Sequence, residues 1–169
     1  MARQSLAQRY GEFIVSTKLA AMPPEAVRNG QMLVASTLAS AALGSTLGSS
    51  QTIRRLEVER GGKPLAHAWF GNWEGLPVVA SARVNALASD AAASDDSDLR
   101  NIVHSGTPAC AAALAVGQAV GASGADVTEA IVLGYEVAGN INTAMVGGLQ
   151  RKGLHGGIVA TFAAAAAAA

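Results

Sequence analysis

The chain has 169 residues, enough for one domain with a hydrophobic core; half of them are hydrophobic and only 14% are charged. This composition excludes intrinsic disorder, and a net charge of zero without a basic cluster argues against nucleic-acid binding. Aromatic residues make up only 4%, so we expect a core of alanine, valine, leucine and isoleucine in closely packed helices.

A single cysteine, Cys110, makes an internal disulfide impossible and fits a reducing compartment. It lies in an apolar run, which favours a buried structural thiol over a nucleophile. No signal peptide is visible, and no apolar run reaches the roughly 20 residues of a membrane span without glycine or charge. We therefore expect a cytoplasmic protein that is not inserted in a membrane.

The spacing of apolar residues and the positions of proline and glycine predict helices at 5–21, 24–43, 77–89, 108–120 and 126–146, and another from about residue 158. Thr52–Arg60 alternates apolar with charged residues, a Gly-Gly-Lys-Pro turn follows, and Leu65–Phe70 is extended, which predicts a β-hairpin over 52–70. Trp69 and Trp73 are expected to cover an edge of the core. The predicted fold class is mainly α, a helical domain with one β-hairpin.

The chain stops inside its last predicted helix, in the alanine run 163–169, without a capping residue. Three interpretations stay open: the chain is cut from a longer protein, the alanines stand for side chains of unknown identity, or this helix pairs with a partner. The apolar segments 108–120 and 158–169 are expected to be covered by a lid domain or a second subunit, most simply in a homodimer.

Two polar loops concentrate the groups that can move protons. The first carries three carboxylates, a hydroxyl and a histidine, and the second carries two cations and a histidine: Asp90, Asp95, Asp96, Ser97 and His104, then Arg151, Lys152 and His155. The 108–120 helix leads away from the first loop and the 126–146 helix leads back, so both loops should lie at one end of the core. His104 and His155 should then lie within roughly 10 Å of each other across a ligand pocket.

Histidines suit acid/base catalysis near neutral pH, which makes His104 and His155 the natural candidates for proton transfer. The alternative is that both are ordinary loop histidines bound to backbone groups. A metal site built from these histidines and aspartates is a further alternative, but no ligand pair has the tight spacing of a zinc-binding helix.

Several motifs, taken in order, resemble the N-terminal helical domain of the MmgE/PrpD family: Ala82–Asn85, Asp95–Ser97, His104–Pro108, Leu133–Val137 and Lys152–His155. That family includes 2-methylcitrate dehydratase, cis-aconitate decarboxylase and iminodisuccinate epimerase. The resemblance implies that 1–169 is a helical domain, that a lid domain lies beyond Ala169, and that the protein is a cofactor-independent dehydratase of a small di- or tricarboxylate. An epimerase, a decarboxylase, or a non-catalytic binding or assembly subunit remain the alternatives.

The resemblance also implies a set of site residues, with no metal and no cofactor. The catalytic set is His104, His155, Ser97 and Asp90, and the substrate-binding set is Lys152, Arg151, Asp95 and Asp96. Asp95 and Asp96 can alternatively order their loop as turn acceptors.

Ser97 stands for a threonine of the family pattern, and Lys152 stands for an arginine. Asp90 replaces a histidine of the family pattern, while Ala93 and Ser36 each replace an aspartate. The aspartate that the family has at the position of Ala93 is a site residue in the decarboxylase. These departures argue against decarboxylation. Asp90 lies one helical turn from Ala93, so it can restore the missing carboxylate.

Overall fold

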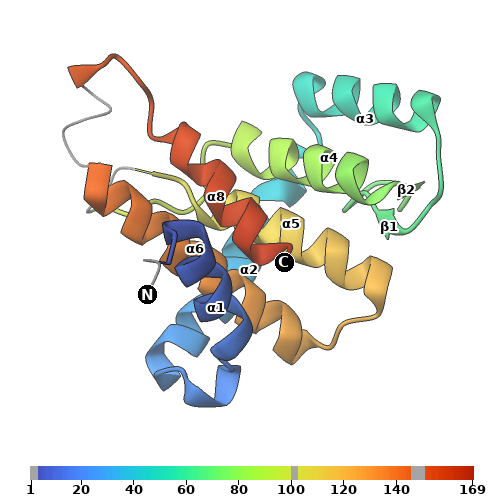
Figure 1. The fold of residues 1–169 in the computed structure, drawn as a ribbon. Coiled ribbons are helices and arrows are strands. Elements are labelled where there is room, and N and C mark those ends of the chain that lie inside the picture. Colours follow the sequence, from blue (N-terminus) through green and yellow to red (C-terminus); the bar gives the residue numbers. More distant parts are fainter. Residues whose placement is uncertain (1–3, 100–102, 146–150) are drawn as a thin grey trace.

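Helices form most of the structure, and Figure 1 shows how they are arranged. The computed structural model describes residues 4–99, 103–145 and 151–169. In chain order the elements are α1 (Leu6–Ser16), the 3-10 helix η1 (Leu19–Ala21), α2 (Pro24–Gly44), α3 (Gly48–Arg60), β1 (Ala66–His67), β2 (Gly75–Leu76), α4 (Val78–Ala91), α5 (Gly106–Val120), α6 (Gly124–Met145) and α8 (Gly157–Ala167). The fold is mainly α with a small antiparallel sheet, as predicted.

The predicted helix boundaries lie close to the observed ones because proline and capping residues fix them locally. Pro24 occupies the first turn of α2, where its missing N–H needs no partner. Ser5 caps α1 in a reciprocal capping box with Gln8. The predicted helix 5–21 is divided at Thr17, whose extended backbone ends α1 before η1 begins.

The main core forms where α5 contacts α4, α6 and α8. Small apolar residues from three of these helices are fully buried in it, namely Ala109, Cys110, Ile131, Ala138, Val159 and Ala163. Burial raises the pKa of the Cys110 thiol to about 11, so this thiol stays protonated at neutral pH and the predicted buried thiol is confirmed. The expectation that 108–120 needs another domain or subunit to cover it is wrong for most of the segment, because these neighbouring helices already bury it.

Glycine allows two pairs of helices to approach at backbone distance. A β-carbon on Gly44 of α2 would lie 1.7 Å from the carbonyl oxygen of Ala88 in α4. A β-carbon on Gly134 of α6 would lie 2.6 Å from the carbonyl oxygen of Ala163 in α8. Close approach of small residues therefore replaces large aromatic side chains as the means of packing this core.

The predicted strand at 52–60 is wrong, because these residues belong to α3. Glutamate, arginine and leucine are good helix formers, and Gly61 ends the helix with φ 66°. The helix also buries one of the charged residues of this segment. Glu57 is only 5% exposed, and its carboxylate pairs with Arg83 of α4 at 2.6 Å and with Arg60 at 2.9 Å.

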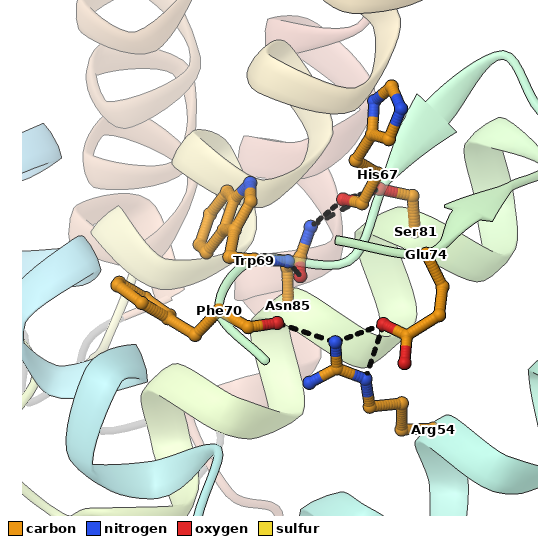
Figure 2. Close-up of polar contacts among 7 residues, drawn as sticks. All are labelled: Arg54, His67, Trp69, Phe70, Glu74, Ser81 and Asn85. Carbon is orange, nitrogen blue, oxygen red and sulfur yellow. Dashed lines mark hydrogen bonds and ion pairs between the residues drawn. The ribbon is translucent and has the colours of Figure 1, made fainter. Parts of the chain in front are cut away.

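The hairpin forms later in the chain, where β1 pairs antiparallel with β2 through Ala66 opposite Leu76 and His67 opposite Gly75. Arg54 of α3 supports its loop by donating hydrogen bonds to the Phe70 carbonyl and to the Glu74 carboxylate (Figure 2). A helical Thr52–Arg60 thus positions the hairpin instead of forming half of it.

Asn85 of α4 fastens the hairpin to the helical core (Figure 2). Its side-chain oxygen accepts a hydrogen bond from the backbone N–H of Trp69 at 2.7 Å, and its side-chain NH₂ group donates one to the backbone carbonyl of His67 at 2.9 Å. Trp69 is 4% exposed and covers the core as expected, whereas Trp73 is 55% exposed and stacks on the His67 ring. Asn85, the last residue of the Ala82–Asn85 motif, therefore has a structural role here.

Among the described residues, no single helix is long and apolar enough to cross a membrane. Helices α2 and α3 meet that test of length and composition only as a pair, and the chain bends by 93° between them. The two most apolar helices, α5 and α8, are shorter than a span requires.

Candidate functional site

A cavity of about 340 Å³ lies between the end of α4 and the N-termini of α5 and α8. Polar side chains from both predicted loops line it together with small apolar residues: Asp90, Asp95, His104, Thr107 and His155, then Ala86, Leu87, Pro108, Gly157 and Ala160. The two histidines come from distant parts of the chain, and both line this cavity. Their shared location is what the antiparallel arrangement of α5 and α6 predicted, while their catalytic role stays a prediction.

His104 reaches the cavity because a short bridge closes the loop before it. The N–H of Asp98 donates to the carbonyl of Val103 at 2.9 Å, in an isolated antiparallel bridge, and the Val103 side chain is buried. The His104 side chain is 47% exposed, so it is anchored through its backbone neighbour and still open toward the cavity.

The buried carboxylate of Asp95 lies beside the His104 ring. The Oδ2 atom of Asp95 lies 3.3 Å from Nδ1 of His104, and the Asp95 side chain is only 4% exposed. The same oxygen accepts a hydrogen bond from the Thr107 hydroxyl at 3.1 Å, and the Thr107 hydroxyl lies 3.1 Å from that of Ser89. Asp95 is therefore held by the core, and it can orient the imidazole.

His155 is placed differently, at the start of α8. The N–H of Gly157 donates to Nδ1 of His155 at 3.0 Å. A β-carbon on Gly157 would lie 3.1 Å from that nitrogen, so glycine makes room for the ring. The His155 ring is thus fixed by the backbone of the next helix and not by a carboxylate.

Asp96, the neighbour of Asp95, faces away from the histidines. Its Oδ1 atom accepts from the Thr107 N–H at 3.3 Å, in the first turn of α5, where Ser105 makes no side-chain capping bond. Its carboxyl lines a separate cavity of about 490 Å³ between α2 and α6, together with Ser36 and Tyr135. The predicted substrate-binding role of Asp96 is not supported by its position, because this side chain does not line the histidine cavity.

Burial raises the pKa of Asp96 above its ordinary value, and repulsion from the Asp95 carboxylate adds to this effect. Hydrogen bonds from the backbone of Gly106 and Thr107 and from the Tyr135 side chain act in the opposite direction, and burial outweighs them. Among the residues that the structure describes, none donates a hydrogen bond to the buried Oδ2 atom of Asp96. Asp96 therefore caps the first turn of α5.

Three other predicted site residues lie outside the cavity wall. Ser97, Arg151 and Lys152 are exposed and do not line the cavity. No lysine or arginine lines this cavity within the described part of the chain, although Arg151 and Lys152 lie in the short segment leading to His155. In the described ranges, no group of three or more histidine, cysteine, aspartate or glutamate side chains is arranged to hold a metal ion.

Asp90 and Ala93, two positions at which the sequence differs from the family pattern, lie within and just after the last turn of α4. Asp90 lines the cavity, whereas Ala93 is exposed and has a left-handed backbone with φ 50°. The carboxylate at 90 therefore lies on the wall of the histidine cavity.

Sequence reasoning missed three residues that build this site, namely Thr107, Gly106 and Gly157. Thr107 lies inside the His104–Pro108 motif, so the motif itself contained the signal. A β-carbon on Gly106 would lie 2.3 Å from Oδ1 of Asp96, a close approach that depends on tertiary structure and leaves no local pattern.

Comparison with known protein families matches residues 8–169 to the MmgE/PrpD N-terminal domain. No curated protein and no solved structure matches the chain significantly. The family match covers nearly the whole chain, including α4, α5 and α8, whose residues line the histidine cavity.

Proposed function

This chain belongs to the MmgE/PrpD family through its N-terminal domain, and from that premise we propose that it is the helical domain of a cofactor-independent lyase. The proposed reaction is dehydration of a small hydroxylated di- or tricarboxylate, with 2-methylcitrate as the first substrate to test. We place the activity in the cytoplasm and expect a homodimer completed by a lid domain.

The observation that carries this proposal is the pair of histidines on one cavity, with His104 held against a buried carboxylate. Dehydration beside a carboxylate begins with removal of a carbon-bound proton, which needs a base that is neutral near pH 7. It then develops negative charge on the carboxylate, which needs a hydrogen-bond donor or a cation. The cavity offers imidazoles for both tasks.

The charge of the substrate needs its own explanation, because Asp90 and Asp95 line the cavity without a lysine or arginine among the described lining residues. The N-termini of α5 and α8 both open onto this wall, and a helix N-terminus favours anions. We assign Arg151 and Lys152, which precede His155, to the second substrate carboxylate. The exposed Ser97 hydroxyl is proposed to contact substrate when the lid closes.

The decarboxylase alternative is weakened because position 93 carries no carboxylate and Ala93 is exposed. The non-catalytic alternative draws on a specific observation, the excess of carboxylates over cations on the cavity wall. The dehydratase and the non-catalytic subunit differ in one measurable property, which is whether the protein forms an alkene from a hydroxy acid.

The test is an ultraviolet assay of alkene formation from 2-methylcitrate and from citrate. His104→Ala should lower kcat/KM by about 10²- to 10⁴-fold, the usual loss when a general base is removed. His67→Ala is the matched control, because His67 lies in β1 and does not line the cavity. Binding of these acids without turnover by the wild type would favour the non-catalytic subunit.

A further inference from the structure

The two histidines of the cavity differ in what their Nδ1 atoms contact. Nδ1 of His104 lies 3.3 Å from a carboxylate oxygen of Asp95. Nδ1 of His155 lies 3.0 Å from the backbone N–H of Gly157. A carboxylate can only accept a hydrogen bond and an amide N–H can only donate one, so two neutral rings that keep these contacts carry their protons on different nitrogens.

The Asp95 carboxylate, 3.3 Å from Nδ1 of His104, favours the proton of a neutral His104 ring on that nitrogen. A neutral imidazole has one N–H, and a hydrogen bond to Asp95 requires it on the nitrogen facing the carboxylate. Thr107 strengthens this assignment, because its single hydroxyl proton is donated to the same Asp95 oxygen. Ser89 must then be the donor to Thr107 in their 3.1 Å contact. The chain of donors ends on Asp95, and the lone pair of a neutral His104 ring then lies on Nε2.

Gly157 has the opposite effect on His155. Its N–H occupies the lone pair of Nδ1, so that nitrogen carries no proton while the contact exists. The neutral ring must therefore carry its proton on Nε2. Full protonation would place two N–H groups against each other and break the contact. In this arrangement His155 is a neutral hydrogen-bond donor.

We infer that the two histidines have fixed and different tasks: His104 is the general base through Nε2, and His155 is a neutral donor through its Nε2–H. This inference rests on the proposed dehydratase function and divides its chemistry between the two rings. Asp95 and Gly157 are positioning residues, since each acts on substrate only through the ring that it holds.

The step that follows is balanced within the site. Nε2 of His104 takes the proton from the carbon beside a substrate carboxylate, and the C–H electron pair forms the carbon–carbon double bond. The carbon–oxygen bond to the hydroxyl breaks, and His104 returns the proton to that oxygen, so that water leaves. His155 donates its hydrogen bond to the carboxylate oxygen on which negative charge develops, and it transfers no proton. Both rings end the cycle as they began it.

The protonation pattern can be tested without substrate. The chain has three histidines, so ¹⁵N-labelled protein gives three ring systems, which single alanine variants assign. At a pH where the rings are neutral, long-range ¹H–¹⁵N spectra should show His104 with Nδ1–H and His155 with Nε2–H. Asp95→Ala should remove the preference of His104 and leave His155 unchanged. The same tautomer for both rings, or the reverse pair, would overturn the inference.

Glutamine variants test the tasks themselves, since an amide side chain can donate a hydrogen bond but cannot act as a base. His155→Gln should stay within about tenfold of the wild-type kcat, whereas His155→Ala should lose about 10²- to 10³-fold, as for a lost oxyanion donor. His104→Gln should lose as much as His104→Ala, about 10²- to 10⁴-fold.

An active His104→Gln enzyme beside an inactive His155→Gln enzyme would reverse the assignment and overturn it. Failure of the proposed function gives a different result. In that case the wild type turns over neither 2-methylcitrate nor citrate, while the spectra still decide whether the two rings carry their protons as inferred.

Discussion

The Asp96 carboxylate occupies the space beside Gly106 where a side chain would otherwise begin. A β-carbon on Gly106 would lie 2.3 Å from Oδ1 of Asp96 and 2.6 Å from its carboxyl carbon. This contact lets one loop residue cap α5 while its neighbour Asp95 reaches His104. The order of the histidine cavity therefore depends on a glycine that lines no part of it.

Gly106→Ala should destabilise the fold, because the new methyl group must displace the carboxylate that caps α5. We expect a loss of roughly 1–3 kcal/mol in the free energy of unfolding, measured by urea denaturation. Gly139→Ala is the matched control, since no atom of the described residues lies within 4 Å of a β-carbon there. In the middle of α6 that alanine should instead stabilise by up to about 1 kcal/mol. Equal effects of the two variants would contradict the proposed contact.

Arg54→Ala should loosen the hairpin, because Arg54 supports both the Phe70 carbonyl and the Glu74 carboxylate. Side chains of this pair are 15% and 25% exposed, so the expected loss of roughly 1–3 kcal/mol lies between exposed and buried ion pairs. The neighbouring Arg55 is exposed, and Arg55→Ala should leave stability nearly unchanged. A similar loss in both variants would mean that general charge, and not this contact, matters.

The local signals in the sequence were sufficient for most helices but not for α3. Proline at 24 and glycine after α5 act within one turn of the chain, so they mark ends correctly. The alternation in Thr52–Arg60 suggests a strand and outweighs the helix propensity of its glutamate, arginine and leucine residues, while the observed helix buries Glu57 against Arg83 of α4. Alternating charges in a sequence do not reveal that partner.

The candidate site was partly predictable for the same reason. Topology alone brought His104 and His155 to one cavity, because α5 and α6 run antiparallel. The different directions of Asp95 and Asp96 could not be foreseen, since adjacent carboxylates look alike in sequence. Their separation follows from the position of Thr107, which contacts one through its hydroxyl and the other through its N–H.

Asp96→Asn should gain stability relative to the wild type as the pH rises from about 3.8, the ordinary pKa of aspartate. Burial raises the pKa of Asp96 in the folded state, so the native state binds more protons than the unfolded state in this range. Wild-type stability therefore falls there, while asparagine keeps an acceptor for Thr107 and does not titrate. Denaturation curves across the acid range measure the difference, and a difference independent of pH would contradict the prediction.

Glu74→Gln should show the opposite dependence. Burial opposes ionisation of Glu74, but its hydrogen bonds and the charge of Arg54 prevail and hold its pKa below the ordinary 4.5. The ionised form therefore contributes stability that is present above pH 4.5 and is lost as the pH falls through the lower folded value. The advantage of the wild type over Glu74→Gln should shrink on acidification. An advantage that grows at low pH would contradict the ion pair with Arg54.

Ala93→Gly should stabilise the protein, because Ala93 has a left-handed backbone with φ 50° directly after the cap of α4. Its N–H donates to the Asp90 carbonyl at 2.9 Å, which is the bond expected at the position where glycine usually ends a helix. Relief of about 1–2 kcal/mol of strain, less the added entropy of the unfolded chain, leaves a gain of up to about 1 kcal/mol. Thermal denaturation measures it.

Ala92→Gly is the matched control for that change, since Ala92 has a right-handed helical backbone with φ −79° and should lose up to about 1 kcal/mol. The same backbone argument bears on the departure from the family pattern. Aspartate tolerates the left-handed region better than alanine does, so Ala93→Asp should fold without loss. If the carboxylate of Asp90 already fulfils the role of the family aspartate, Ala93→Asp should not raise kcat/KM for alkene formation, and a large increase would show that Asp90 does not replace it.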